Sequence, residues 1–492
     1  MLKKHRGFLL GILIAVLTLI FTVPATGGVT FPDTPPGNRM KAYLEALNSQ
    51  DKDVWKEYCS GDFWQKGNGP EEVEHRLGMF ERLTLDLGGV EPVKIAENSA
   101  TRITVTVHAV KPSGPMEWVN FTLETAPEEP YQIVGLTVRP SEKPSDGSPQ
   151  RKLSDEEIVD SLKVYLAGLA AKDMFSGTVL LAKDDRVLFK EAYGTACKRY
   201  DVPNRTDTKF NLGSMNKMFT GVAVAQLAEQ GKLSYDDPII KYLPDYPNRE
   251  AAEKVKIRHL LTHTSGMGSY WGELFAVNFW KIKTVQQLAD LIMDKPLEFE
   301  PGERFSYSNS GPVILGLIIE KITGMSYYDY VNEYIYKPAG MINSGCFEVD
   351  RPVKNVAIGY ARVDYDGRPS DDWYNNLFMH AVKGGPAGGG YSTVEDLFRF
   401  SRALREYKLL NEETTNLVVS GKEDMGPDMK YGYLFGDRNE NGYRIVGHSG
   451  GAPGINANLD IYWEAGYTAA VMSNYDRAAS EVSRELRILI AR

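Results

Sequence analysis

The feature that most constrains the fold of this chain is the placement of strand-like segments at both ends of its larger part. Strand-like runs of residues occur at each of these ends. The five predicted strands are residues 177–183, 187–193, 443–447, 457–463 and 467–473. The stretch between them, about residues 213–430, is predicted to be mostly helix and loop. We therefore expect a sheet built from the two ends, with a catalytic cleft between it and an inserted helical subdomain.

Residues 139–153 are rich in Pro, Ser, Gly and charge, which indicates a linker. It separates an accessory domain, residues 26–138, from a larger domain, residues 154–492. In the small part, helical patterns at about 39–58 and 71–85 precede strand-like alternation at 93–95, 102–110, 117–123 and 131–138. This order predicts a small α+β cone, and its pattern resembles the nuclear-transport-factor-like or cystatin-like fold. It contains no catalytic constellation.

The N-terminus has the pattern of an export signal. Lys3, Lys4 and Arg6 precede an apolar stretch at residues 8–23, and small residues follow Pro24. We favour a signal peptide at residues 1–25, cleaved after Ala25, and a secreted or periplasmic protein. The alternative is an uncleaved anchor formed by residues 8–23, which would keep the protein on the membrane but also outside the cytoplasm.

Composition excludes several classes of partner and cofactor. The net charge is −9, and no long basic run follows the N-terminus, which argues against nucleic-acid binding. The three cysteines include no C-x-x-C pair. His259 and His263 have the i, i+4 spacing of zinc ligands, but the glutamate of an H-E-x-x-H motif is absent. We therefore expect no metal and no cofactor, and a small-molecule or peptide substrate.

The chemistry of the larger domain centres on Ser214 and Lys217. Residues three apart on a helix share one face, so the hydroxyl and the amine come within reach of each other. A nucleophilic serine needs a neighbouring base, and a lysine serves as one when burial removes its proton. Apolar and small residues follow Lys217, as in a buried helix. Ser49 and Lys52 have the same spacing, but in a polar stretch where the amine would stay charged.

Two further motifs fit acyl-transfer chemistry. Tyr307 and Asn309 lie in a Ser-rich loop after Pro301 and Gly302. A phenol beside a cationic lysine is expected to have a lowered pKa and to act as base and acid. The Asn309 amide offers a donor and an acceptor to a substrate amide.

The third motif is the run His448-Ser449-Gly450-Gly451, directly after a predicted strand. Its glycines would let a substrate lie against the strand edge. Backbone N–H groups at that edge, together with the Ser214 N–H, can form an oxyanion hole.

In this order, the three motifs resemble the serine β-lactamase and penicillin-binding protein superfamily, and in particular the branch of class C β-lactamases, DD-peptidases and esterases. The runs 257–267 and 388–393 support the resemblance, which covers roughly residues 154–492. It implies a β-lactamase-like antiparallel sheet flanked by helices. It also implies roles for the motif residues: Ser214 as nucleophile, Lys217 as its activating amine, Tyr307 as general base and acid, Asn309, His448, Ser449 and Gly450 in substrate binding, and the Ser214 and Gly451 N–H groups as oxyanion hole.

The resemblance leaves open whether Lys217 or Tyr307 takes the serine proton. His448 stands where class C β-lactamases carry a lysine, and a histidine is mostly neutral at pH 7. A permanent charge to hold a substrate carboxylate is therefore missing. We expect a secreted serine hydrolase that is DD-peptidase-like or esterase-like. The alternatives are a β-lactamase proper and a non-catalytic binding or regulatory protein on the same scaffold.

Overall fold

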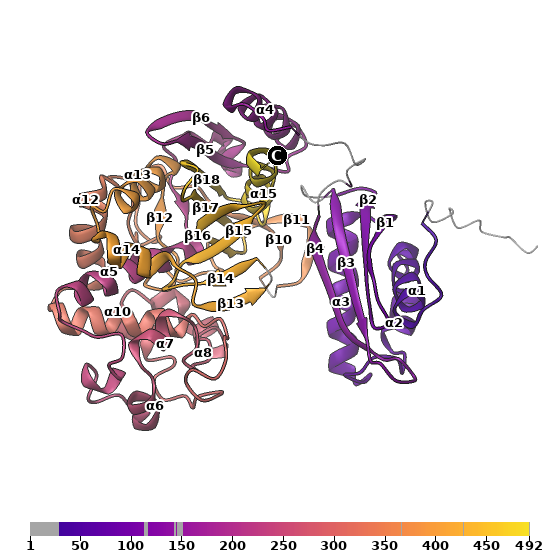
Figure 1. Ribbon diagram of the computed structural model, residues 1–492, viewed down its shortest axis with the longest axis horizontal. Helices are drawn as coiled ribbons and strands as arrows, with labels where there is room; N and C mark the ends of the chain where they lie inside the picture. The colour runs from indigo at the N-terminus through magenta and orange to yellow at the C-terminus, as the bar shows by residue number, and fades with distance from the viewer. Residues whose placement is uncertain are drawn as a thin grey trace, which may run out of the picture. The chain divides into compact units, whose positions relative to one another are not determined.

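The structure of the protein is a computed structural model that describes residues 29–112, 117–141, 144, 151–365, 367–426 and 428–491 (Figure 1). The chain divides into two compact units. Among the described residues, the first contains a four-stranded sheet and the two helices nearest the N-terminus, and the second contains residues 151–491 together with residues 74–88. No helix within the described ranges is long and apolar enough to cross a membrane. The predicted signal or anchor lies outside the described residues.

In the first unit, two helices precede an antiparallel sheet in the order β1-β2-β3-β4. The elements are α1 (Pro35–Ser49), α2 (Lys52–Cys59), β1 (Val90–Asn98), β2 (Arg102–Ala109), β3 (Trp118–Thr125) and β4 (Ile133–Pro140), and α3 (Pro70–Leu87) lies between α2 and β1 in the chain. The single helix expected at residues 39–58 is two helices. Gln50 adopts a left-handed conformation with φ 51°, and the Asp51 carboxylate caps α2 by accepting the Asp53 N–H. Ser49 and Lys52 therefore lie on different helices.

The second unit is built on an eight-stranded antiparallel sheet in the order β13-β14-β15-β16-β17-β18-β5-β6. Its strands are β13 (Glu423–Gly426), β14 (Met429–Tyr431), β15 (Gly436–Glu440), β16 (Tyr443–Ala452), β17 (Ile455–Tyr462), β18 (Tyr467–Ser473), β5 (Gly177–Lys183) and β6 (Arg186–Tyr193). The pairing of β18 with β5 joins the two ends of the domain, as expected. Strands β13 to β15 were not expected, because they are short and rich in Gly, Asp and Asn.

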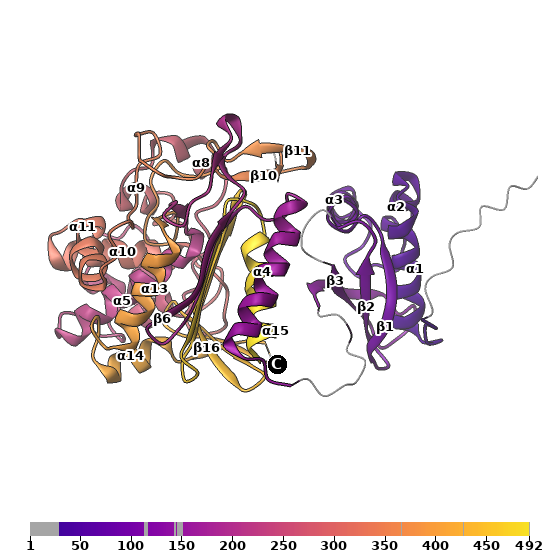
Figure 2. The same ribbon diagram turned by 90° about the horizontal axis from the view of Figure 1, so that it is seen from above.

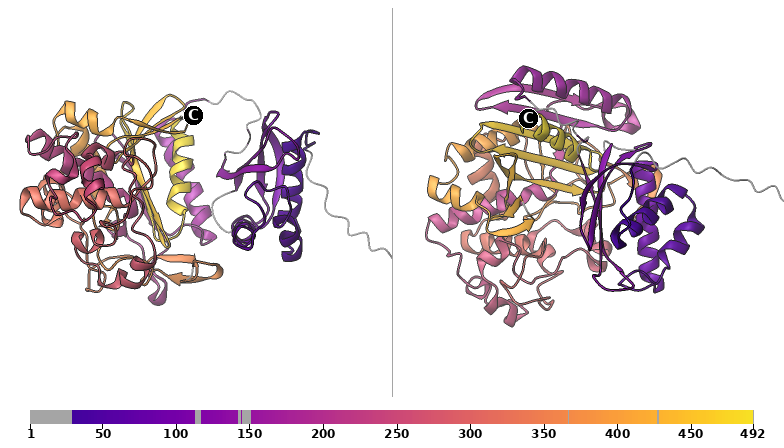
Figure 3. Two further views of the ribbon diagram at one scale, coloured as in Figure 1. Left: turned by 90° about the horizontal axis from the view of Figure 1, so that it is seen from below. Right: turned by 45° about the vertical axis from the view of Figure 1, so that its right-hand side comes forward.

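Helices cover both faces of this sheet (Figure 2). On one face lie α4 (Asp155–Ala171) and α15 (Ala478–Ala491), side by side, as Figure 3 also shows. On the other face lie α5 (Asn216–Glu229), α10 (Ser310–Thr323) and α13 (Val394–Arg405). A hydrophobic core lies on each face of the sheet, and successive residues of β5 face the two cores alternately. Val179 and Leu181 pack toward α4 and α15, and Leu180 packs toward the inserted helices. This explains why the strand is apolar without interruption.

Shorter elements complete the second unit, mostly within the insertion. They are β7 (Thr195–Cys197), β8 (Val202–Pro203), β9 (Phe210–Asn211), α6 (Arg249–Lys254), α7 (Ile257–Leu261), α8 (Glu273–Asn278), α9 (Val285–Ala289), α11 (Tyr327–Val331), α12 (Lys337–Ala339), β10 (Tyr360–Val363), β11 (Pro369–Asn375), β12 (Tyr391–Ser392) and α14 (Glu412–Val419). One short turn, η2 (Gly213–Met215), separates β9 from α5 and carries Ser214.

Candidate active site

Lys217 lies in the first turn of α5 and is fully buried. Residues 216–227 of this helix are all buried, as the apolar sequence predicted. The Lys217 Nζ lies 3.1 Å from Ser214 Oγ, 2.7 Å from Asn309 Oδ1 and 2.6 Å from the Ala387 carbonyl oxygen. Asn309 and Ala387 present oxygens that can only accept. A neutral amine that donates its two hydrogens to them therefore keeps its lone pair for the Ser214 hydroxyl.

The surroundings of Lys217 favour that neutral amine. Among the described residues no carboxylate forms an ion pair with it, and burial lowers the pKa of Lys217 to about 7. Desolvation disfavours the charged form of a lysine, and nothing here offsets it. Near neutral pH, Lys217 is thus able to exchange a proton with Ser214.

Tyr307 lies on the loop before α10, with its ring 4.9 Å from the Lys217 Nζ. The expectation that Lys217 lowers the pKa of this phenol is wrong. Burial raises the pKa of Tyr307, and the hydrogen bond with Ser214 offsets only part of the rise. Tyr307 is 41% exposed, so water in the cleft moderates the rise without reversing it. The neutral hydroxyl is therefore its resting form at pH 7, because burial disfavours the charged phenolate.

Strand β16 approaches the Ser214 turn closely, and glycines make this possible. A Cβ at Gly450 would lie 1.9 Å from the Leu212 carbonyl oxygen and 2.9 Å from the Ser214 nitrogen. A Cβ at Gly213, which has φ +50°, would lie 2.9 Å from the Gly451 nitrogen. The predicted oxyanion pair, the N–H groups of Ser214 and Gly451, is thus brought together by residues that have no side chain.

His448 is the one member of the third motif whose side chain contacts another part of the site. Its Nε2 lies 2.9 Å from the Tyr431 hydroxyl, and its Nδ1 lies 2.5 Å from the Ser449 carbonyl oxygen. Burial and the nearby Lys217 lower the pKa of His448 to about 4. The imidazole is therefore neutral at pH 7. Ser449, the next residue, is exposed to solvent.

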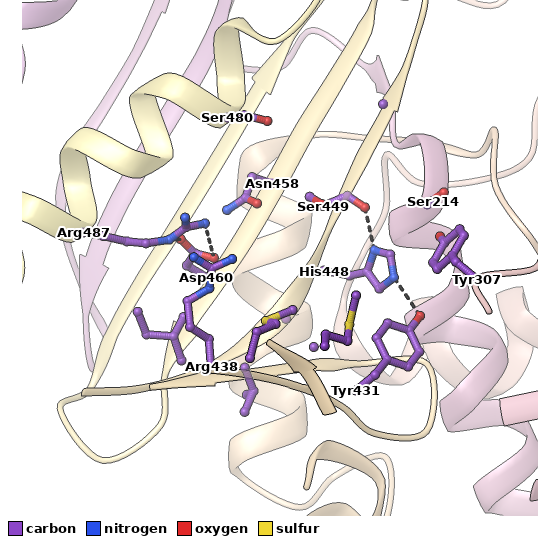
Figure 4. Close-up of a pocket in the computed structure, with 17 residues that line it drawn as sticks. Ser214, Tyr307, Tyr431, Arg438, His448, Ser449, Asn458, Asp460, Ser480 and Arg487 are labelled. Carbon is purple, nitrogen blue, oxygen red and sulfur yellow. Dashed lines mark hydrogen bonds and ion pairs between the residues drawn. The ribbon is translucent and has the colours of Figure 1, made fainter. Parts of the chain in front are cut away.

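Ser214 borders two hollows. The first cleft, about 400 Å³, is lined among others by Tyr307, Tyr431, His448, Met425 and Met429 (Figure 4). Ser214 and Tyr307 lie at one end of it, and the ion pair of Asp460 and Arg487 lies at the other. The second cleft, about 320 Å³, is lined among others by Asn309, Tyr270, Trp271, Phe275 and Leu288. Ser214 and Gly451 line both hollows.

Sequence reasoning missed three groups that touch the site. The Ala387 carbonyl is a backbone atom, so no residue type signals its contact with Lys217. Tyr431 lies on β14, a strand that was not predicted. His263 was considered only as a metal ligand and rejected, yet its ring lies 4.3 Å from the Tyr307 ring. Within the described residues, no three His, Cys, Asp or Glu side chains are grouped so that they could hold a metal ion.

Comparisons with known proteins agree with this architecture. A sequence model of the β-lactamase family matches residues 163–492. Penicillin-binding protein 4* of Bacillus subtilis strain 168 is 33% identical over 64% of this chain and 71% of its own length. Esterase EstB of Burkholderia gladioli is 28% identical over 55% of this chain and 77% of its own. The solved structure of a penicillin-binding protein from Bacillus halodurans matches with a TM-score of 0.59 and 30% identity, and covers 68% of this chain and all of that one.

The region matched by the family contains the eight-stranded sheet, the buried helix α5 and all residues that border the two clefts. These relatives include penicillin-binding proteins and an esterase. On the strength of the matched region and the shared fold, the chain belongs to the β-lactamase family and is a serine hydrolase.

Proposed function

We propose that the protein cleaves an amide, peptide or ester bond through an acyl-enzyme on Ser214. The observation that carries this proposal is the environment of Lys217, an uncompensated buried amine in contact with the Ser214 hydroxyl. An enzyme that needs a base near neutral pH requires such a group. A structural lysine would instead be expected to have a carboxylate partner.

In the proposed mechanism, Lys217 takes the proton of Ser214 as the serine oxygen attacks the substrate carbonyl carbon. The N–H groups of Ser214 and Gly451 stabilise the oxyanion that forms. Tyr307, whose hydroxyl is neutral, donates its proton to the leaving group as the C–N or C–O bond breaks, and regains one from Lys217. Water then hydrolyses the ester on Ser214 by the reverse sequence of proton transfers. This division of roles assigns the base to Lys217 and the acid to Tyr307.

The two parts of the substrate, its leaving group and its acyl portion, bind in different clefts. Tyr307 lines the first cleft, so the leaving group occupies this side. Asn309 lines the second cleft, where its amide contacts the acyl portion. The aromatic and aliphatic wall of Tyr270, Trp271, Phe275 and Leu288 favours an apolar acyl side chain there. Ser449 and Gly450 contribute the backbone edge of β16 to substrate binding.

We further propose that the protein acts outside the cytoplasm, since residues 1–25 have the pattern of an export signal. It is secreted or periplasmic if the signal is cleaved, and membrane-anchored if residues 8–23 are retained. In either case, residues 26–138 form an accessory domain, residues 139–153 a linker and residues 154–492 the hydrolase.

A substrate panel tests this function. Nitrocefin, a peptide ending in D-Ala-D-Ala, p-nitrophenyl acetate and a D-amino acid amide are compared on wild type, Ser214→Ala and the matched control Ser49→Ala. We expect turnover of the ester or the amide by wild type and Ser49→Ala, and none by Ser214→Ala. Nitrocefin as the best substrate would favour the β-lactamase alternative. No turnover, together with no labelling by a fluorescent penicillin or a fluorophosphonate, would favour the non-catalytic one.

A further inference from the structure

His263 follows α7 and packs against the loop that carries Tyr307. It is 1% exposed and has a left-handed backbone with φ +58°. A positive φ is uncommon for a residue other than glycine, although histidine adopts it more often than most, and it persists where the surroundings hold it. The proposed mechanism gives His263 no task.

His263 holds the loop that carries Tyr307 on both sides of that residue. Its backbone carbonyl accepts the Ser306 N–H at 2.9 Å, and its Nδ1 accepts the Ser308 N–H at 3.2 Å. Its ring packs on the Tyr307 ring with centroids 4.3 Å apart. The position of the Tyr307 hydroxyl relative to Ser214 therefore depends on His263.

The hydrogen bonds of His263 also fix its protonation state. Because Nδ1 accepts a backbone N–H, it carries no proton, and the neutral ring bears its proton on Nε2. This Nε2 lies 3.1 Å from the Tyr431 hydroxyl oxygen, to which it donates. The Tyr431 hydrogen is then available for another acceptor.

That acceptor is His448. Its Nδ1 faces the Ser449 carbonyl, which can only accept, so Nδ1 carries the proton. Its Nε2 is left as an acceptor for the Tyr431 hydroxyl. The four bonds therefore run in one direction, from the Ser308 N–H through His263, Tyr431 and His448 to the Ser449 carbonyl. A proton added to the His448 Nε2 would leave the Tyr431 hydrogen without its acceptor.

We propose that His263 is a positioning residue for Tyr307, and that Tyr431 links it to His448. The side chains of this hydrogen-bond chain are all uncharged, and together they hold Tyr307 and His448 in place on the two walls of the first cleft. This inference rests on the proposed function. It also narrows the substrate class, because both His448 nitrogens are occupied and the ring offers no charge beside Ser214. Arg438 and Arg487 line the cleft further away, near the acidic Glu440 and Asp460. The leaving groups that fit next to Ser214 are therefore uncharged amides and esters.

Nitrogen-15 NMR of the full-length, histidine-labelled protein at pH 7 tests the chain directly. Ring nitrogen shifts distinguish the two neutral tautomers and the imidazolium. We expect neutral His448 with its proton on Nδ1 and neutral His263 with its proton on Nε2, assigned through His448→Gln and His263→Asn. An imidazolium or the opposite tautomer at either position would overturn the proposal. This readout does not depend on any activity, so it stands apart from a failure of the proposed function.

Kinetics on matched variants test the effect on catalysis. Tyr431→Phe removes the hydroxyl that joins the histidines, and Tyr433→Phe is its control, because Tyr433 packs on Tyr235 and contacts neither histidine. For an uncharged amide, we expect Tyr431→Phe to lower kcat about tenfold with KM within about twofold, and Tyr433→Phe to match wild type. Equal kinetics for the two variants, with melting temperatures unchanged, would contradict the linking role.

The positioning role of His263 has its own conservative variant. Asn tolerates a positive φ and offers an oxygen to the Ser308 N–H, whereas Ala offers neither. We therefore expect His263→Asn to retain about tenfold more kcat than His263→Ala, while both still react with a fluorophosphonate at Ser214. Equal kcat for the two variants would show that the ring bond to Ser308 does not position Tyr307.

Discussion

At the scale of single residues, the proposed reactivity of Ser214 rests on Lys217, a buried lysine that forms no ion pair with any carboxylate among the described residues. Lys217 donates to two carbonyl oxygens and faces the Ser214 hydroxyl, and burial lowers its pKa to about 7. Tyr307 has the opposite shift, since burial raises its pKa. Two titratable groups with pKa values moved apart suit the roles of base and acid.

This pair predicts the pH dependence of the reaction. The Lys217 pKa is lowered, so the amine is protonated below about pH 7 and neutral above it. We expect kcat/KM for an uncharged ester to rise with pH up to about 7 and then level off, and to fall about tenfold per pH unit below. His448, with a pKa of about 4, adds no step between pH 5 and 8. A flat profile down to pH 5, or a step lost in His448→Gln, would contradict these assignments.

A second prediction separates the acid from the base. Lys217→Ala should lower kcat/KM for all substrates by about 100- to 10,000-fold, because every acylation needs the base. Tyr307→Phe should do so for an amide but have a much smaller effect on p-nitrophenyl acetate, whose leaving group needs no proton. Tyr200→Phe, at an exposed position, serves as control. Equal losses on amide and activated ester in Tyr307→Phe would show that this hydroxyl is not the acid.

At the scale of elements, the site depends on the close approach of β16 to the turn before α5. The Gly450 Cα faces the Leu212 carbonyl with no room for a methyl group. In contrast, Gly168 on α4 is exposed, and a Cβ there would meet nothing within 4 Å. A side chain at Gly450 would therefore clash with the backbone, whereas a side chain at Gly168 would have free space.

Alanine substitutions at these glycines should have opposite effects. We expect Gly450→Ala to destabilise the fold by about 1–3 kcal/mol through overpacking and to reduce acylation of Ser214. Gly168→Ala should stabilise by about 0.5–1 kcal/mol, because alanine favours a helix, and leave activity unchanged. Urea unfolding and ester turnover measure both effects. Normal activity in Gly450→Ala would show that the oxyanion pair does not require this contact.

The sequence was sufficient to predict the elements with a strong hydrophobic pattern, and insufficient to predict the short polar elements. The five strands and α5 were predictable because their apolar residues must be buried. Strands β13 to β15 were not, since they are short and polar and each is held by pairing with its neighbour in the sheet. The contact between Ser214 and Lys217 followed from their spacing of three residues, although Ser214 lies on the turn η2 and not on α5 itself. The pKa of Tyr307 did not, because the burial that raises it depends on residues distant in the chain.

At the scale of the whole molecule, all groups of the proposed mechanism come from the second part of the chain. The sheet, α5 and the residues that line both clefts lie within residues 154–492. The first part adds a four-stranded sheet with its own helices. We therefore expect a small substrate to need only the second part.

A truncated protein tests this division. We expect residues 151–492 to fold and to hydrolyse p-nitrophenyl acetate with a kcat/KM within about threefold of the full chain, because acylation uses only groups of that part. Circular dichroism is the control for folding. A folded fragment without activity would show that residues 26–138 contribute to the chemistry.

The central claim, acylation of Ser214 with Lys217 as base, is tested most directly by mass spectrometry of the trapped intermediate. The protein is mixed with a slowly hydrolysed ester, quenched in acid and digested. We predict one acyl group per chain, located on Ser214, and its rate of appearance should fall at least 100-fold in Lys217→Ala. An acyl group on another residue, or acylation of Ser214 at the wild-type rate in Lys217→Ala, would contradict the account.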